Sequence, residues 1–158
     1  MYIRTIQAED NSDIETIIRQ CLIDFGGNRA GLAWEDESLC HLFDYYNQEG
    51  RAYWVAFDAN GKMLGGCGIA QFGSPEEKIC ELQKMYLIEE ARGTGVAKEL
   101  LETALQFAKL HYKVCYLETL HNMAAANKFY KKHGFRLLES PLAGSEHFAC
   151  DAWYIRDL

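Results

Sequence analysis

One glycine-containing turn constrains the fold of this chain more than any other stretch. An apolar run from Leu82 to Ile88 leads into the turn Glu89-Glu90-Ala91-Arg92-Gly93-Thr94-Gly95. Beyond it, apolar residues recur at the spacing of one helix face, at Val96, Ala97, Leu100, Leu101, Ala104, Leu105 and Ala108. This order of strand, turn and helix predicts free N–H groups and a partial positive charge at the helix N-terminus, which favour a bound phosphate or pyrophosphate.

Two common phosphate-binding motifs fit this turn poorly. The dinucleotide fingerprint requires a third glycine where this chain has Lys98, and no Gly-Lys-Ser/Thr follows to make a Walker motif. A bare Gly-x-Gly can also be a tight corner between strand and helix that binds no ligand, and this is the alternative to a phosphate site.

The residues at the turn and a second stretch resemble a known family. Arg92-Gly93-Thr94-Gly95-Val96-Ala97 resembles the Q/R-x-x-G-x-G/A signature of the GNAT superfamily of N-acetyltransferases. The stretch from Asn127 to Phe135 is similar to that family's second signature, a helix that carries a tyrosine and ends in Gly-Phe. The resemblance implies an α/β fold with a mixed, mostly antiparallel twisted sheet. It also implies helices on both faces and a central parallel strand pair that splays apart.

The other segments are consistent with one such domain over residues 1–158. We expect strands at residues 1–6, 51–57, 63–72, 79–88, 114–119, 135–138 and 147–155. Asn60-Gly61 predicts a hairpin between two of these strands. Gly65, Gly66 and Gly68 predict a bulge or a close neighbour in the strand that follows.

Four helices are expected between these strands. The first starts with a capping box of Ser12 and Glu15, and the second carries apolar residues from Leu39 to Tyr46 at helical spacing. The third follows the glycine turn to about residue 111. The fourth runs from Met123 to about residue 133, with Asn122 as its cap and Gly134 just beyond its end.

Composition disfavours several classes of function. The chain has 158 residues and a net charge of −7, so a nucleic-acid binder with a basic face is not expected. No apolar run is long enough for a membrane span, and the first residues are typical of a strand, not of a signal peptide. The six cysteines form no C-x-x-C pair, which predicts core packing, no zinc site and a reduced, cytoplasmic setting.

The resemblance implies acetyl-CoA as the co-substrate. Backbone groups of the turn would hold its pyrophosphate, at Arg92, Gly93, Thr94, Gly95, Val96 and Ala97. Met85, Tyr86 and Leu87 on the central strand would pair with the pantetheine arm like an added strand. The family commonly has an asparagine where this chain has Met123, so Asn127, one turn further on, is the substitute candidate for that contact.

The implied chemistry is direct transfer of the acetyl group to a primary amine in a ternary complex. Tyr130 is the expected proton donor to the departing thiolate, with aromatic packing as its structural alternative. Glu81 is the expected base, with Glu118 and His121 as rivals, and a salt bridge to Lys84 is its structural alternative. No metal is expected, because the thioester is already activated. A cysteine that carries the acetyl group is a weaker alternative.

The acceptor site is expected between the second helix and the last strands. Its candidate residues are Trp34, Glu35, Asp36, Glu37, Tyr45, Tyr46, His147 and Asp151. Acidic and aromatic side chains suit an ammonium group, although a solvated helix start explains the acids equally well. We expect a small-molecule or peptide amine as partner, and a homodimer is common for such domains. Two alternatives stay open: a non-catalytic acyl-CoA-binding module, and a nucleotide-phosphate binder of another α/β fold.

Overall fold

The computed structural model describes residues 1–158, which form a seven-stranded sheet in the order β1-β2-β3-β4-β5-β7-β6. The strands are β1 (Tyr2–Thr5), β2 (Ala52–Phe57), β3 (Met63–Phe72), β4 (Ile79–Leu87), β5 (Val114–Thr119), β6 (Arg136–Leu138) and β7 (Ala152–Asp157). The α-helices are α1 (Asn11–Asp24), α2 (Leu42–Tyr46), α3 (Val96–His111) and α4 (Ala124–Lys132). Short 3₁₀ turns join them: η1 (Ala8–Asp10), η2 (Ala33–Glu35), η3 (Glu37–Cys40), η4 (Pro75–Glu77) and η5 (Glu89–Ala91).

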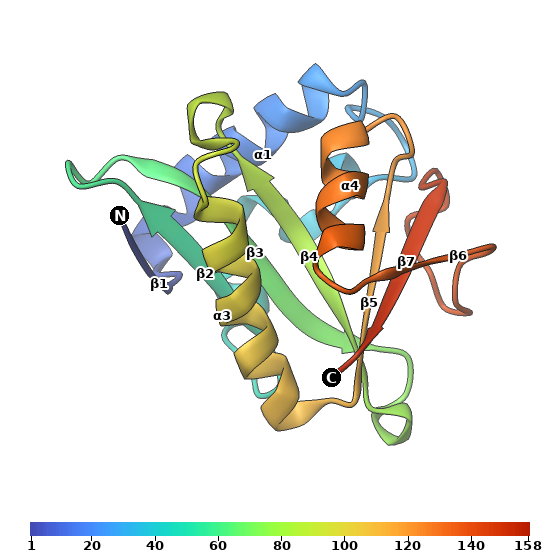
Figure 1. The fold of residues 1–158 in the computed structure, drawn as a ribbon. Helices are drawn as coiled ribbons and strands as arrows, with labels where there is room; N and C mark the ends of the chain where they lie inside the picture. The colour runs from blue at the N-terminus through green and yellow to red at the C-terminus, as the bar shows by residue number, and fades with distance from the viewer.

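The sheet is antiparallel except at its centre, where β4 and β5 run parallel. These two strands pair only at Ile79–Val114, Cys80–Cys115 and Glu81–Tyr116. Beyond that point they diverge, and α4 lies over the widening gap in Figure 1. The predicted mixed sheet with a splayed central pair is therefore confirmed.

A bulge in β4 accompanies this divergence. Lys84 has φ +48°, which is unusual for a residue with a side chain, and the β3–β4 register shifts between Gly66 and Gly68. The Tyr53 hydroxyl donates a 2.7 Å hydrogen bond to the Lys84 carbonyl oxygen. The predicted bulge near the β3 glycines is confirmed, and it brings the backbones of β3 and β4 close together at Gly65.

Each face of the sheet has its own hydrophobic core. On one face, the predicted apolar stripe of α3 is buried, with Leu100 and Ala104 fully inaccessible. On the other, Ile14 and Ile18 of α1 pack with the α2 segment against Val55 of β2. Helices therefore cover both faces, as expected (Figure 1). No helix combines the length and the apolar character that crossing a membrane requires.

The first helix begins at Asn11, close to the expected position, but its predicted capping box is wrong. The chain enters α1 through the turn η1, and Ser12 and Glu15 make no capping box. The Asp10 carboxylate instead accepts a 2.8 Å hydrogen bond from the Gln7 backbone N–H and pairs with Arg4 at 2.7 Å. This cap depends on an ion pair with β1, which local sequence does not reveal.

Three other element predictions also need correction. The expected second helix is broken at His41, whose φ of −146° and ψ of 53° are not helical, so only α2 is α-helical. The last strand begins at Ala152, not at His147, because the preceding loop is held by the Ala149 N–H, which donates to Gly31. Met123, not Asn122, is the N-cap residue of α4, and no side chain caps that helix end.

The close approach of β3 and β4 yields a test of the bulge. A Cβ on Gly65 (φ +149°) would overlap the Tyr86 carbonyl oxygen, whereas one on Gly61 (φ +81°) would meet nothing within 4 Å. We expect Gly61→Ala to cost about 1–2 kcal/mol of unfolding free energy for its backbone conformation alone. Gly65→Ala should cost about 2–5 kcal/mol, because the overlap is added. Urea unfolding measures both, and equal losses would contradict the close approach.

Candidate functional site

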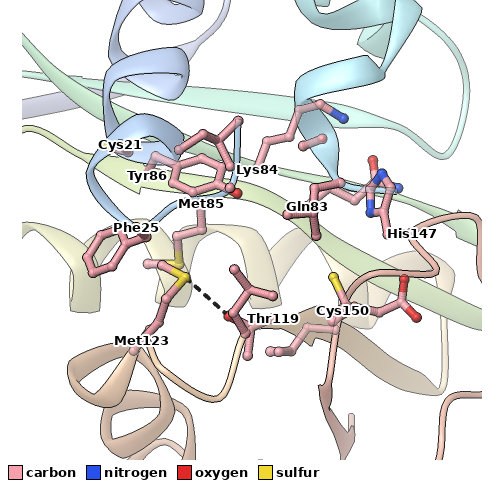
Figure 2. A pocket seen from close by; sticks show the side chains of 18 of the residues that line it. Cys21, Phe25, Gln83, Lys84, Met85, Tyr86, Thr119, Met123, His147 and Cys150 are labelled. Carbon is pink, nitrogen blue, oxygen red and sulfur yellow. Dashed lines mark hydrogen bonds between the residues drawn. The ribbon is translucent and has the colours of Figure 1, made fainter. Parts of the chain in front are cut away.

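A cleft of about 820 Å³ opens where β4 leaves β5. Its walls come from β4, β5, α1, α4 and the loop before β7. Figure 2 shows Phe25 and Met123 in one part of this cleft and Gln83, His147 and Cys150 in another. The cleft therefore passes from the α4 side of the sheet to the side of the β6–β7 loop.

The glycine turn lies at the α4 side and has the properties of an anion site. Gly93 and Gly95 have φ of +74° and +94°, and a Cβ on either would meet nothing within 4 Å. The backbone N–H groups of residues 93–95 donate no hydrogen bond within the chain. The Thr94 hydroxyl donates to the Ala91 carbonyl oxygen and fixes the turn. Val96 and Ala97 begin α3, so the first N–H groups of that helix face the same way as the turn. Open space and free donors fit a phosphate group.

The side chain of Arg92 joins this turn to the end of β4. Its guanidinium donates to the Leu87 carbonyl oxygen at 3.2 and 3.3 Å and lies 5.5 Å from the Phe25 ring centre. An apolar groove of about 740 Å³ runs from here along Met85 and Tyr86 towards α4. The structure thus brings together Met85, Tyr86, Leu87, Arg92, Gly93 and Ala97, all of them predicted, in the wall of one groove.

Tyr130 lies where this groove meets the cleft. Its side chain is buried against Phe135 and Tyr154 and lines both spaces. Its hydroxyl has no hydrogen-bond partner in the chain. Every fully enclosed polar side-chain atom in the structure has a partner, so this hydroxyl is not fully enclosed. The hydroxyl therefore reaches the open space of the cleft. Burial raises the pKa of this phenol well above its ordinary value.

Asn127 has a different environment from the one expected. Its amide nitrogen donates to the carbonyl oxygens of Leu120 and Met123, at 3.0 and 2.8 Å. Its amide oxygen accepts a 2.6 Å hydrogen bond from the Tyr154 hydroxyl. Met123 lines the cleft instead, where its sulfur accepts a hydrogen bond from Thr119 (Figure 2). A contact of Asn127 with a ligand stays a prediction. Its amide nitrogen holds the start of α4, and its amide oxygen ties that helix to β7.

Glu81 is a buried carboxyl on β4 at the point where the two strands part. It is 9% exposed, and one of its oxygens accepts a 2.7 Å hydrogen bond from the Gln83 amide. Burial, with a contribution from the charge of Glu118, raises its pKa to about 7. The alternative salt bridge with Lys84 is not formed, because the Lys84 ammonium lies 2.7 Å from Asp36.

Glu118 and His147 form a cluster with Glu81. These three residues could together hold a metal ion. One donor atom from each of the three lies within 4.8 Å of the others. The Tyr116 hydroxyl donates to Glu118 at 2.8 Å, and His147 Nε2 lies 2.9 Å from Asp36. Burial lowers the pKa of His147, but the hydrogen bond and charge of Asp36 outweigh it and raise that pKa overall.

A second, polar cavity of about 1280 Å³ adjoins this cluster on the side away from the groove. Of the residues expected around the acceptor, it is lined by Glu35, Asp36, Glu37, Tyr45 and His147. Trp34 packs under Arg19, and the buried Tyr46 donates its hydroxyl to Gln83. Asp151 instead pairs with His121 at 3.2 Å, and His121 is 80% exposed. The structure therefore does not bring His121 near the other candidate bases.

The cysteines divide by environment. Cys21, Cys67, Cys80 and Cys115 are buried as expected, but core packing is wrong for Cys40, which is exposed. Its sulfur lies 3.3 Å from Nδ1 of His41, its neighbour in sequence. Cys150 lines the cleft, where burial and nearby carboxylates raise its pKa to about 12. A thiol with that pKa stays protonated near neutral pH and is a poor nucleophile.

An opened sheet with a turn of free N–H donors at its mouth is the arrangement that the resemblance to the GNAT superfamily implies. The family model described as "Acetyltransferase (GNAT) family" matches residues 14–135 of this chain. The chain therefore belongs to the GNAT family, and it is an acyltransferase of the acetyl-CoA-dependent N-acetyltransferase class.

Individual relatives agree with this assignment. The uncharacterized N-acetyltransferase YjgM of Escherichia coli (strain K12) is 36% identical over 157 residues, which are 98% of this chain and 93% of that protein. N-acetylaspartate synthetase of Xenopus tropicalis is 38% identical over 93 residues, 58% of this chain and 33% of that protein. The crystal structure of a GNAT phosphinothricin acetyltransferase from Sinorhizobium meliloti, in complex with AcCoA, has a TM-score of 0.79. It is 21% identical, with 99% of this chain and 88% of that chain covered.

The raised pKa of Glu81 predicts a pH effect on stability. Because the folded-state pKa of about 7 lies above the ordinary value of 4.5, the protonated form is favoured by folding. Its contribution to stability is complete below about pH 4.5 and is lost as the pH rises through about 7. We expect Glu81→Gln to be more stable than the native chain at pH 8 and to lose that advantage at pH 5, as measured by urea unfolding. The exposed Glu76→Gln is the control, and a pH-independent difference for Glu81→Gln would contradict the burial.

Proposed function

We propose that this domain, residues 1–158, transfers the acetyl group of acetyl-CoA directly to a primary amine in a ternary complex. One observation carries the proposal: the three spaces along the sheet adjoin one another through shared lining residues. The groove beside the glycine turn and the central cleft share Met85, Tyr86 and Tyr130, among others. The central cleft and the polar cavity share Glu81 and His147. Two substrates can thus meet from opposite sides of the splayed strands.

In this arrangement, the turn holds the co-substrate and the groove guides its arm. Backbone N–H groups of residues 93–97 bind the pyrophosphate. The Arg92 N–H instead donates to the Glu89 carbonyl oxygen, and Thr94 and the Arg92 side chain keep the turn in place. Met85, Tyr86 and Leu87 offer the strand edge that faces the opening. The bound thioester supplies an activated acetyl group, and Asn127 acts indirectly by fixing the start of α4.

Glu81 acts as the base in this proposal. An alkyl ammonium has a pKa of about 10.4, so it must lose a proton before it can attack the thioester. A carboxylate with a pKa of about 7 is ionised for a useful fraction of the time at neutral pH and can accept that proton. Glu118 and the His147–Asp36 pair lie beside it and lead towards the polar cavity.

Tyr130 acts as the acid. When the new C–N bond has formed and the C–S bond breaks, the sulfur leaves as a thiolate that needs a proton. The Tyr130 hydroxyl reaches the cleft and donates no hydrogen bond to the chain, so its proton is available for that step. The step balances, because an ammonium loses two protons on becoming an amide: Glu81 takes the first before attack, and the Tyr130 phenolate takes the second after its own proton has gone to the thiolate. Glu81 then releases its proton to solvent.

Calorimetry with acetyl-CoA tests the binding half of the proposal. We expect the native chain to bind acetyl-CoA tightly. Gly95→Trp places a large side chain in the open space at the turn and should abolish that binding. Gly61→Trp is the matched control, because Gly61 has a similar positive φ and open surroundings in a remote hairpin. Native-like binding by Gly95→Trp would overturn the assignment of the turn, and no binding by the native chain would overturn the proposed function.

Kinetics distinguish an enzyme from a module that only binds acyl-CoA. With an accepted amine, we expect Glu81→Gln and Tyr130→Phe each to lower kcat by about 100-fold, while the affinity for acetyl-CoA stays within about twofold. The loss in Glu81→Gln should shrink at high pH, where more of the amine is already neutral. Thiol release measures the rates. Unchanged kcat in both variants would show that neither group transfers a proton.

A further inference from the structure

The polar cavity on the acceptor side carries an excess of negative charge. Six carboxylates line it, at Glu35, Asp36, Glu37, Glu81, Glu118 and Glu146. Lys84 is the one lysine or arginine in its wall, and His41 and His147 are the two histidines. Whatever enters this cavity must therefore be compatible with a strongly negative potential.

The single strong cation in the wall is already neutralised. The Lys84 side chain is 5% exposed, and its ammonium lies 2.7 Å from Asp36. Asp36 also holds His147 at 2.9 Å. The other five carboxylates make no ion pair within the chain, so the cavity offers unpaired anions and no free lysine or arginine.

These five carboxylates lie at two depths. Glu81 and the half-buried Glu118 lie at the inner end, beside the cleft. Glu81 is nine-tenths buried, and only one of its oxygens accepts a hydrogen bond. Every fully enclosed polar side-chain atom has a partner, so the second oxygen is not enclosed and points into open space. Glu35, Glu37 and Glu146 are exposed at the outer part of the cavity. The wall thus has an inner and an outer negative region.

We propose that the acceptor is a small diamine or polyamine. This inference rests on the proposed function and specifies its substrate class. The amino group to be acetylated lies at Glu81 and Glu118, where it loses a proton, and a second ammonium group lies against Glu37 and Glu146. The outer contact raises the local concentration of the substrate and orients its inner nitrogen towards the thioester.

The same charges disfavour an amino acid as the acceptor. An α-carboxylate next to the reacting amine would enter beside Glu81 and Glu118 without a free cation to pair with. A buried anion that lacks such a partner is costly, and like charges at close range add to the cost. Aspartate, with two carboxylates, is therefore the sharpest negative control.

Matched acceptors test the proposal in a thiol-release assay with acetyl-CoA. The set is 1,4-diaminobutane, n-butylamine of the same chain length, spermidine, L-aspartate and a short lysine-rich peptide. We expect kcat/KM for the diamine to exceed that for butylamine by about two- to fivefold, the effect of one exposed ion pair. The ratio should fall towards one at 0.5 M salt, because salt screens contacts at the surface.

Variants assign this preference to the outer carboxylates. The double variant Glu37→Gln, Glu146→Gln should lower kcat/KM for the diamine more than for butylamine, so that the ratio of the two falls towards one. The control double variant Glu76→Gln, Glu139→Gln removes two exposed carboxylates outside the cavity and should keep the preference. Because the variants are compared on two acceptors, a partly unfolded preparation lowers both rates and leaves their ratio intact.

The outcomes separate this inference from the function on which it rests. Failure of the native chain to bind acetyl-CoA overturns the proposed function itself. If the chain binds acetyl-CoA but its best acceptor is butylamine, aspartate or the peptide, the proposed acetyltransferase function stands and the polyamine assignment is overturned. Binding of acetyl-CoA with no acetylation of the diamine or spermidine also overturns the polyamine assignment. Preference for the diamine, lost only in the double variant of the cavity, supports it.

Discussion

The divergence of β4 from β5 is the constraint on which the rest of the site depends. Two parallel strands in mid-sheet would normally pair along their whole length, yet here pairing stops after Glu81. Three residues later, Lys84 adopts a left-handed backbone conformation that costs about 1–2 kcal/mol. The hydroxyl of Tyr53, which is itself buried, compensates by donating to the Lys84 carbonyl oxygen. The bulge is thus held by a side chain from the face of the sheet that α1 and α2 cover. The edge of β4 that faces β5 stays unpaired beyond Glu81.

The side chain of the same lysine organises the acceptor wall. Lys84 and His147 both contact the Asp36 carboxylate, which joins β4, the η2–η3 segment and the loop before β7. A buried ion pair of this kind adds little net stability, because desolvation offsets the attraction, but loss of one partner leaves a buried charge uncompensated. Its main effect here is therefore geometric. Three segments are fixed around one point, and the one lysine of the cavity is removed from contact with substrate.

The sequence predicted those features of the fold that depend on residues close together in the chain. The strand, glycine turn and helix around Gly93 give periodicity and turn chemistry over a short stretch, and the resemblance there implied the splayed sheet that the structure has. The misjudged features depend on distant partners. For Lys84, the local alternative is a salt bridge with Glu81, three residues away, but its partner Asp36 is 48 residues away, and His147 reaches Asp36 across 111 residues. Because His147 is held by that contact, the loop around it cannot join β7, which shortened the predicted strand.

Glu81 shows how one physical cause serves both proposed substrates. Its position beside the splay buries the carboxyl and raises its pKa towards neutrality, which lets it exchange a proton with an amine near physiological pH. Burial alone disfavours the ionised form of this carboxyl. A cationic substrate reverses that penalty, because an ammonium at Glu81 and Glu118 favours the ionised form just before proton transfer. Unpaired carboxylates and a positively charged acceptor are therefore complementary requirements of the same chemistry. A cavity with free lysines or arginines would have stabilised an ionised Glu81 without substrate and lowered its pKa below the useful range.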